Sequence, residues 1–402
     1  MSKVNTNPKA IDELLDRGII VSIFPTKEEF RNFLLSGKRM KIYIGFDATA
    51  DTLHLSHAKN IMLLEDFRKL GHEAILLFGD FTARIGDPSG QAGTRKILSK
   101  KEVLKNVKSW TSQIKNLMDF NNKSNPPRIV FNSKWLAKLT MEEILDLSSY
   151  VTVGQLIERD MFQKRLKENK QISLHEFLYP LMQGYDSVVM EVDAELCGTD
   201  QIFNALMGRT LLKKIKNKEK FVVAVNLMEN PKTRELMSKS RGTGVFLNTT
   251  PSEMYGAIMA QPDEMIHVLF INCTRIPIKE IENILKEKNS LAAKKIVAKE
   301  IVKIIHGEKK SLEAEDFFIK TFQKKEVPDD ILEIEVSEGE ELSEVLLKNN
   351  LVKSKGDFKR LIDEGAITSL GTGSKNITDY HFKITETITL KIGKKRFVRI
   401  II

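Results

Sequence analysis

Short apolar runs of strand length alternate with helix-patterned segments between residues 41 and 228. Residues 41–47 form a β-type run, and the following segment HAKNIMLLEDFRKLGH has apolar residues at helical spacing, ending at Gly71 as a helix C-cap would. Further strand candidates are EAILLFGDF (73–81), RIVFNSKW (128–135) and KFVVAVNLM (220–228). This alternation predicts an α/β fold with a doubly wound, Rossmann-type parallel sheet, whose ligands bind beyond the carboxyl ends of the strands.

Three longer stretches depart from the alternation, and a length of 402 residues favours two or three domains. Residues 133–178 are typical of a mostly helical insertion that could serve as a subunit contact. Residues 250–322 are helix-patterned, with one amphipathic stretch closed by Gly307. Residues 326–344 are acidic and carry Pro and Gly, as interdomain connectors do. Residues 345–402 hold 12 Lys and Arg against 5 Asp and Glu, so the basic charge is concentrated in the tail.

Composition excludes several classes of protein. No window approaches 18 uninterrupted apolar residues, so a membrane span is not expected, and the acidic, amphipathic N-terminal segment does not resemble a secretion signal. We therefore expect a cytoplasmic protein. Cys197 and Cys273 are too few for a disulfide framework or a four-thiolate zinc site and are expected to be buried thiols. The net charge of +9 permits an acidic partner without demonstrating one.

Two histidines, His54 and His57, follow the strand at 41–47. At positions i and i+3 of an early helix turn they project to one face, beside backbone N–H groups and the positive end of the helix dipole. This pattern predicts an anion site in which imidazole N–H groups donate to phosphate oxygens. Two other interpretations stay open for such a pair alone. One is a metal pair, for which the sequence shows no obvious third or fourth ligand, and the other is two ordinary surface histidines.

The segment RELMSKSRGTG (234–244) is a second candidate. It carries Ser238 and Ser240 around Lys239, followed by Arg241 and two glycines. Such a loop can fold over a polyphosphate and withdraw, although a segment of this kind, taken alone, is usually an ordinary polar loop.

The order of the motifs narrows the interpretation. The HLSH motif after the first strand of an α/β fold, with MSKS much later, resembles the paired H-I-G-H and K-M-S-K-S signatures of class I aminoacyl-tRNA synthetases. The stretches YIGFDATADTLHLSH, GDFTARIGDPSG, SLHEFLYPLMQGYDS and CGTDQIFN resemble the bacterial tyrosyl-tRNA synthetases in sequence and order. The resemblance spans most of the chain. It implies activation of L-tyrosine with ATP to tyrosyl-adenylate and pyrophosphate, then transfer of the tyrosyl group to the terminal adenosine ribose of tRNA(Tyr).

The resemblance also implies a domain organisation and partners. We expect a Rossmann-fold catalytic domain at 1–246, with the helical insertion at about 133–178 as the contact of a homodimer. An α-helical anticodon-recognition domain is expected at 247–325, an acidic linker at 326–341 and a small α+β domain of the alpha-L RNA-binding type at 342–402. ATP with Mg²⁺ is the expected cosubstrate, and no structural metal is expected.

Tyrosine-binding roles are implied for six positions. Tyr43 and Asp186 match the residues that hydrogen-bond the phenol of the substrate, a pair that would be left unpaired by phenylalanine. Tyr179 and Gln183 share a helix face with Asp186 and match residues that hold the ammonium group and the ring. The full set is Tyr43, Asp87, Tyr179, Gln183, Asp186 and Gln201.

Nucleotide-binding roles are implied for a second set. Thr49 and His54 match the pair that holds the γ-phosphate in the transition state, His57 and Lys239 complete the phosphate cradle, and Asp200 matches a residue on the ribose hydroxyls. The expected catalytic residues are His54, His57, Thr49 and Lys239. The expected ATP-binding residues are Gly45, Asp47, His54, His57, Gly198, Asp200, Met237, Ser238, Lys239 and Arg95.

The tail is similar to the alpha-L RNA-binding motif. Clustered bases contact phosphates and make affinity dependent on salt without reading sequence. The resemblance implies that tRNA is contacted by Lys353, Lys355, Lys359, Arg360, Lys394, Lys395 and Arg396. A solvated basic face is the alternative for a charge run considered by itself.

The chain departs from the family pattern at Ala48, Ser56, Cys197 and Leu236. Ser56 replaces the glycine that lets adenine lie close to the backbone, and Leu236 replaces the first lysine of K-M-S-K-S. Arg234 and Arg241 are candidates to compensate for that lysine. Three rival interpretations follow: a tryptophanyl-tRNA synthetase, an adenylating ligase of the pantothenate-synthetase kind, and a catalytically weakened, synthetase-derived RNA-binding protein.

Overall fold

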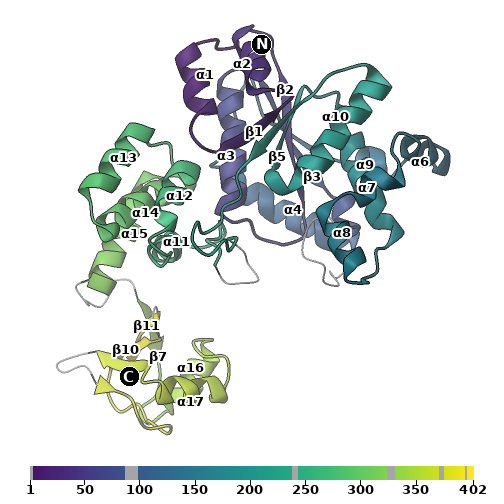
Figure 1. Ribbon diagram of the computed structural model, residues 1–402. Helices are drawn as coiled ribbons and strands as arrows, with labels where there is room; N and C mark the ends of the chain where they lie inside the picture. The colour runs from purple at the N-terminus through teal and green to yellow at the C-terminus, as the bar shows by residue number, and fades with distance from the viewer. Residues whose placement is uncertain (1–2, 87–97, 238–242, 324–330, 371–374, 394–395) are drawn as a thin grey trace. The chain divides into compact units, whose positions relative to one another are not determined.

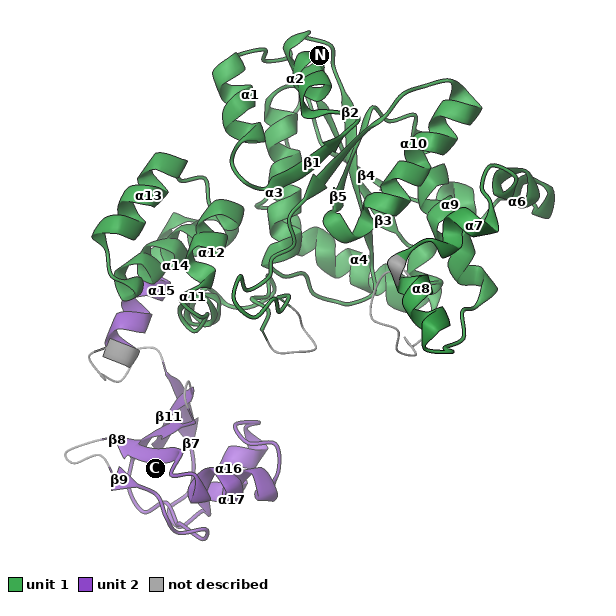
Figure 2. Cartoon of the chain, viewed as in Figure 1, with its two compact units in different colours: residues 1–312 green, residues 313–402 purple. Residues whose placement is uncertain are grey.

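The computed structural model describes residues 3–86, 98–237, 243–323, 331–370, 375–393 and 396–402. The chain divides into two compact units, residues 1–312 and 313–402, which Figure 2 distinguishes by colour. The two units are described separately below.

The first unit is built on a sheet whose strand order is β1-β6-β5-β2-β3-β4 (Figure 1). Pairing is parallel from β6 through β4, whereas β1 runs antiparallel to β6 at the edge. The strand order reverses between β2 and β5, and this switch point is where doubly wound sheets bind ligands. The strands are β1 (Ile20–Phe24), β2 (Lys41–Asp47), β3 (Glu73–Gly79), β4 (Arg128–Phe131), β5 (Ala194–Gly198) and β6 (Phe221–Val225).

Helices connect and cover these strands. Helix α3 packs on β2 and β3, and α10 packs on α9 and β6. The helix that begins beside β2 ends as its sequence predicts, because Gly71 follows α3 with φ +99° and an added Cβ would lie 2.7 Å from the Lys3 carbonyl oxygen. The helices of this part are α1 (Pro8–Leu15), α2 (Lys27–Leu35), α3 (Leu55–Lys69), α4 (Lys100–Ile114), α9 (Leu174–Met190) and α10 (Ile202–Lys216), with short 3₁₀ turns η1 (Thr82–Arg84) and η2 (Thr199–Gln201).

The region predicted as a helical insertion is helical in the structure. Thr140 and Thr152 begin two of its helices with capping boxes, in which each threonine side chain accepts from a backbone N–H three residues later. The helices are α5 (Ser133–Leu136), α6 (Met141–Ser148), α7 (Val153–Ile157) and α8 (Asp160–Lys167), and the first turns of α9 complete the region.

A second helical group follows the sheet. Arg17 anchors it, because its guanidinium donates to the carbonyl oxygens of Ile271, Thr274 and Ile276 at 3.0, 2.8 and 3.0 Å. Helix α14 ends at His306, and Gly307 follows with φ +94°, as its position in the sequence predicts. The helices are α11 (Pro251–Met259), α12 (Met265–Cys273), α13 (Ile278–Glu287), α14 (Ser290–His306) and α15 (Glu308–Phe318), followed by the π-helical turn η3 (Ile319–Gln323).

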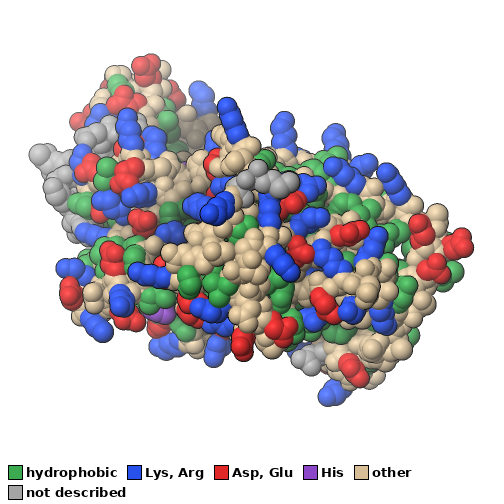
Figure 3. Space-filling view, turned by 90° about the horizontal axis from the view of Figure 1, so that it is seen from above, with side chains coloured by type: hydrophobic (Ala, Val, Ile, Leu, Met, Phe, Trp, Pro, Cys, Tyr) green, Lys and Arg blue, Asp and Glu red, His purple; other side chains and the backbone are tan. Residues whose placement is uncertain are grey.

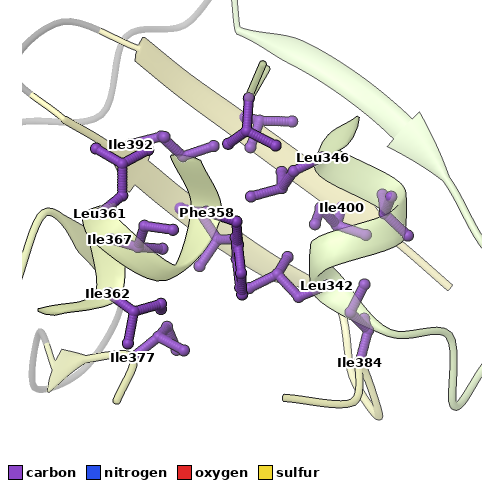
Figure 4. Packing of buried hydrophobic residues seen from close by; sticks show 14 of the residues in the cluster. Leu342, Leu346, Phe358, Leu361, Ile362, Ile367, Ile377, Ile384, Ile392 and Ile400 are labelled. Atoms are coloured by element: carbon purple, nitrogen blue, oxygen red, sulfur yellow. The ribbon is translucent and has the colours of Figure 1, made fainter. Parts of the chain in front are cut away.

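The second unit is an α+β fold with its own core. Two helices cover a sheet of order β7-β11-β10-β8-β9, and Figure 4 shows residues such as Leu346, Phe358 and Ile400 pointing toward one another between them. The elements are β7 (Leu332–Glu335), α16 (Leu342–Lys348), α17 (Lys355–Asp363), β8 (Ile367–Leu370), β9 (Lys375–Asn376), β10 (Ile388–Ile392) and β11 (Arg396–Ile401).

One expectation for this region is wrong. The sequence places residues 332–335 in the acidic linker, but they form β7, which pairs in parallel with β11. Ile334 is buried in the core while Glu333 and Glu335 are exposed, so this acidic segment has the alternation of an edge strand. Because the segment is acidic, its sequence does not show the apolar run by which the other strands were predicted.

The predicted α/β fold with a parallel sheet is confirmed, and the strand candidates correspond to β2, β3, β4 and β6. Lys and Arg side chains are interspersed with Asp and Glu on the face shown in Figure 3. Within the described residues, no helix has both the length and the hydropathy needed to cross a membrane.

Candidate functional site

A cavity of about 300 Å³ lies at the carboxyl ends of β2 and β5, where the strand order reverses. It brings together residues from both predicted sets, drawn from β2, α3, α9, β5 and η2. The predicted residues that line it are Tyr43, Gly45, Asp47, Thr49, His57, Tyr179, Gln183, Asp186, Gly198, Asp200 and Gln201.

The deep end of the cavity is formed by Tyr43 and Asp186, which are 1% and 2% exposed. Trp135 Nε1 donates to Asp186 Oδ1 at 2.7 Å, and Asn132 Nδ2 donates to Oδ2 at 3.3 Å. Burial raises the pKa of Asp186 well above its usual value, while the two donors oppose that shift. The Tyr43 hydroxyl lies 2.9 Å from Ser187 Oγ, and burial raises its pKa well above the usual value, so it stays a protonated phenol.

The middle of the cavity joins the two predicted binding sets. The Tyr179 hydroxyl donates to Asp47 Oδ2 at 2.9 Å, and Thr82 Oγ1 donates to Oδ1 at 2.6 Å. Tyr179 was predicted for tyrosine and Asp47 for the nucleotide, so this bond connects the two sets. Gly79 is required beside them, because a Cβ there would lie 2.1 Å from Asp47 Oδ1.

The two histidines lie at the start of α3. His57 Nδ1 accepts from the backbone N–H of His54 at 3.3 Å, which leaves the ring proton of neutral His57 on Nε2. The ring centroids are 4.1 Å apart. Burial lowers the pKa of His54 to about 4; burial and the neighbouring His54 lower that of His57 to about 3. Both imidazoles of the free protein are therefore neutral at pH 7 and can donate hydrogen bonds without carrying a charge.

The metal interpretation of this pair finds no support in the described part of the chain, where no group of three or more His, Cys, Asp or Glu side chains is placed to hold a metal ion. His54 does not line the cavity, although it contacts His57, which does. Its Nδ1 is buried without a hydrogen-bond partner among the described residues.

Some predicted residues fall elsewhere. Met237 is buried, and its backbone N–H donates to the Met228 carbonyl oxygen at 2.9 Å, but its side chain does not line the cavity. Arg234, a candidate to compensate for Leu236, is paired with Glu229 at 2.7 Å. Asp87, Arg95, Ser238, Lys239, Arg241, Lys394 and Lys395 lie outside the described residues.

Sequence reasoning missed several residues of the site. Asn132 directly follows β4, and Thr82 lies just beyond β3, so the rule that ligands bind beyond strand ends could have identified both. Glu195 lines the cavity from within β5, and Asn60 lines it one helical turn after Ser56. Within the described residues, the buried Oδ1 of Asn60 has no hydrogen-bond partner. A strand carboxylate and a helix amide carry no distinguishing local pattern.

The basic residues predicted to contact tRNA are partly neutralised within the second unit. Arg360 pairs with Asp357 at 2.7 Å and with Glu364 at 2.8 Å, and Lys355 lies 3.2 Å from Glu344. Lys359 lies over the Tyr380 ring, 5.7 Å from its centroid. Lys353 is exposed, and its backbone N–H donates to the Asp357 carboxylate. Arg396 donates to the Leu351 carbonyl oxygen.

Comparisons with known proteins give the family. Residues 35–323 match the family model described as tRNA synthetases class I (W and Y). The tyrosine–tRNA ligase of Carboxydothermus hydrogenoformans is 41% identical over 407 residues, which cover 97% of each chain. That of Thermotoga maritima is 37% identical over 402 residues, with 98% of each chain covered.

A solved structure shows the same fold. The C-terminally truncated mitochondrial tyrosyl-tRNA synthetase of Aspergillus nidulans superposes with a TM-score of 0.67 at 24% identity, covering 78% of this chain and 94% of that one. The family model, the full-length relatives and this fold agree. The chain belongs to the class I tRNA synthetases and, within them, to the tyrosine–tRNA ligase family.

Proposed function

We propose that the cavity is the site where this tyrosine–tRNA ligase activates L-tyrosine with ATP. The observation that carries the proposal is the deep end of the cavity, where a buried carboxylate and a buried phenol hydroxyl lie together. Asp186 would accept the proton of the substrate hydroxyl, and Tyr43 would hydrogen-bond the same oxygen. Phenylalanine would leave both groups buried and unpaired, which costs about 1–3 kcal/mol for each group.

The remaining cavity residues would hold the amino acid and the nucleotide. Tyr179 and Gln183, on the same face of α9 as Asp186, would contact the ammonium group and the ring, with Gln201 and Asp87 nearby. Gly45 would lie beside the nucleotide, although the fold itself does not require glycine there, because an added Cβ would make only ordinary contacts with Leu77 at 3.7 Å and Tyr43 at 4.0 Å. Gly198 and Asp200 would contact the ribose, at the carboxyl end of β5.

The first step is in-line displacement at the α-phosphorus. The tyrosine carboxylate attacks, the bond to the bridging oxygen breaks, and pyrophosphate leaves with the electron pair. No side-chain acid or base is needed. His54, His57, Thr49 and Lys239 would donate to the β- and γ-phosphates as their negative charge grows, and Arg95, Met237 and Ser238 would be further contacts of the nucleotide. In the second step a ribose hydroxyl of the terminal adenosine attacks the acyl carbon, and AMP leaves.

Mg²⁺ belongs to this proposal as a companion of ATP. Asp47, a carboxylate of the cavity lining, already accepts from Thr82 and Tyr179. Mg²⁺ commonly keeps several waters and takes its other ligands from substrate phosphates, so the phosphates of ATP would supply most of its coordination. When bound it neutralises phosphate charge.

A homodimer through the helical insertion is the second part of the proposal. Large apolar side chains are exposed on its helices, including Met141 at 72%, Leu145 at 62% and Leu174 at 77%. Met141 and Leu145 lie one turn apart on α6 and so share a face, and an exposed apolar face marks an interaction site. A second copy of the chain is the occupant that the family resemblance suggests.

tRNA contact by the tail is the third part. Among the predicted tRNA contacts that the structure describes, Lys353, Lys359 and Arg396 form no ion pair with an acidic side chain. Lys355, Arg360 and Arg396 hold contacts within the unit and would contribute less, while the segment carrying Lys394 and Lys395 would add charge. Cytoplasmic location remains part of this proposal, because tRNA is charged where translation uses it.

Pyrophosphate exchange tests the proposal. ATP should incorporate labelled pyrophosphate when tyrosine is supplied, and should not do so with tryptophan, phenylalanine or pantoate. Tyrosylation of tRNA(Tyr) should follow with the same preparation. Exchange driven by tryptophan or pantoate would favour a rival enzyme, and absence of exchange with every substrate would favour a weakened RNA-binding descendant.

A further inference from the structure

A buried ion pair lies behind the deep end of the cavity. Lys220, the residue before β6, contacts Glu195 of β5, and their side chains are 0% and 3% exposed. Lys220 Nζ also donates to Ser187 Oγ at 2.9 Å. Buried ion pairs are a poor source of stability, because desolvation of the two charges offsets their attraction. This pair therefore calls for a role other than stability.

The contacts of Ser187 determine which of its partners donates and which accepts. The Lys220 ammonium can only donate, so Ser187 Oγ accepts from it. Ser187 is fully buried, and its hydroxyl proton needs an acceptor. Among the described residues the only other side-chain partner is the Tyr43 hydroxyl oxygen at 2.9 Å. The arrangement that satisfies both groups has Ser187 donating to Tyr43, which leaves the Tyr43 proton for another acceptor.

Glu195 is the nearby acceptor that could take that proton. Besides burial, its charge and its side-chain hydrogen bond with Tyr43 both raise the pKa of Tyr43, so Tyr43 donates to Glu195 in the free protein. Both of its oxygens are already engaged, however: Lys220 contacts Oε2, and Gln183 Nε2 donates to Oε1 at 3.0 Å. The ion pair and the Gln183 amide weaken Glu195 as an acceptor, so the Tyr43 proton can turn from Glu195 to a substrate oxygen in the cavity.

We propose that Lys220 is a positioning residue for amino-acid selection, which orders the hydrogen bonds from Lys220 through Ser187 and Tyr43 toward the substrate. Tyr43 then donates to the phenol oxygen of tyrosine, and the phenol proton goes to Asp186. Each group at this end has one role, donor or acceptor, before the substrate arrives. The inference rests on the proposed tyrosine-binding role of the cavity.

The test compares Lys220→Met and Ser187→Ala with the wild type. Lys218→Met is the matched control, since Lys218 is an ion-paired lysine two residues away that lies outside the cavity lining. Pyrophosphate exchange gives kcat/KM for tyrosine and phenylalanine and KM for ATP. We expect both variants to raise KM for tyrosine and lower the tyrosine-to-phenylalanine ratio of kcat/KM about 10-fold, the effect of one hydrogen bond. KM for ATP should stay within about 2-fold, and the control should match the wild type.

A double-mutant cycle separates positioning from mere packing. In a Tyr43→Phe background, Lys220→Met should no longer change the tyrosine-to-phenylalanine ratio, because the hydroxyl through which it acts is gone. An unchanged ratio in the single variants, or an equal loss in both backgrounds, would overturn the inference. If Lys220→Met does not fold, Ser187→Ala decides by the same criteria, since it leaves the ion pair in place. A wild type without tyrosine-dependent exchange would overturn the proposed function as well.

Discussion

Replacement of His54 by alanine tests the phosphate cradle most directly. His54 is the N-cap residue of α3, and its ring packs 4.1 Å, centroid to centroid, from that of His57. Its pKa is lowered to about 4 by burial. The imidazole that meets ATP at pH 7 is thus a neutral donor, and the alanine variant removes one hydrogen bond to phosphate without removing a charge.

The expected loss of rate in His54→Ala is therefore that of one hydrogen bond to a charged group. A hydrogen bond to a charged group contributes about 1.5–3 kcal/mol. If the bond strengthens only as pyrophosphate charge develops, the whole amount appears in the barrier, and the rate of adenylate formation falls roughly 10- to 150-fold. The affinity for tyrosine should barely change, because His54 makes no contact at the deep end of the cavity.

Single-turnover formation of tyrosyl-adenylate, with tyrosine affinity measured separately, checks both numbers. His381→Ala serves as the control, because His381 is 80% exposed in the second unit. The pH profile adds a second check: kcat/KM for ATP reports the free enzyme, so it should show no ionisation of His54 near pH 6.5. Equal weakening of tyrosine binding and of the rate, or a step near pH 6.5 that the variant abolishes, would refute the reasoning.

Four further outcomes follow from the described contacts. Asp186→Asn should raise KM for tyrosine about 30-fold in pyrophosphate exchange, because an amide turns a donor toward Asn132, while KM for ATP stays constant. His72 is fully buried, and its pKa is lowered to about 4. The unfolding free energy of the wild type should therefore fall by on the order of 3 kcal/mol as pH drops from 6.5 to 4, because in this range only the unfolded chain takes up the proton. Urea unfolding of His72→Asn should not show this part of the decrease. Replacing Lys353 and Lys359 together by alanine should reduce the salt slope of tRNA binding by about 2, as measured by filter binding. Leu145→Glu should convert a dimer to a monomer in sedimentation, and a dimer that persists would exclude this surface.

The sequence predicted the parts of the fold whose cause is local. Strands β2, β3 and β6 are continuous apolar runs because both faces of a parallel sheet are covered, and such runs are visible in any window. Strand β7 escaped detection because it is exposed and acidic, with only Ile334 turned to the core. The antiparallel edge strand β1 is set by pairing with β6, which no local pattern reveals.

The candidate site divides in the same way. Residues inside recognisable motifs, such as Tyr43, His57 and Asp186, line the cavity. The proposed role of Ser187 and Lys220 depends on their contact in the folded chain. The serine lies on α9, and the lysine precedes β6, 33 positions later in the sequence. A serine in a helix and a lysine before a strand are unremarkable in isolation, so their connection required coordinates.

The two ends of the cavity are prepared differently, and this difference follows from what each must do. At the phenol end Asp186 already accepts from Trp135 and Asn132, so its position is fixed before tyrosine binds. Beside the phosphate end, the buried Nδ1 of His54, whose ring contacts the cavity-lining His57, has no partner among the described residues. Selection between two amino acids requires groups held in place, since a group that could relax would tolerate the missing hydroxyl. Acceleration requires donors whose best partner appears only in the transition state. Substitutions at the first end should therefore change which amino acid is used, and those at the second end should change how fast.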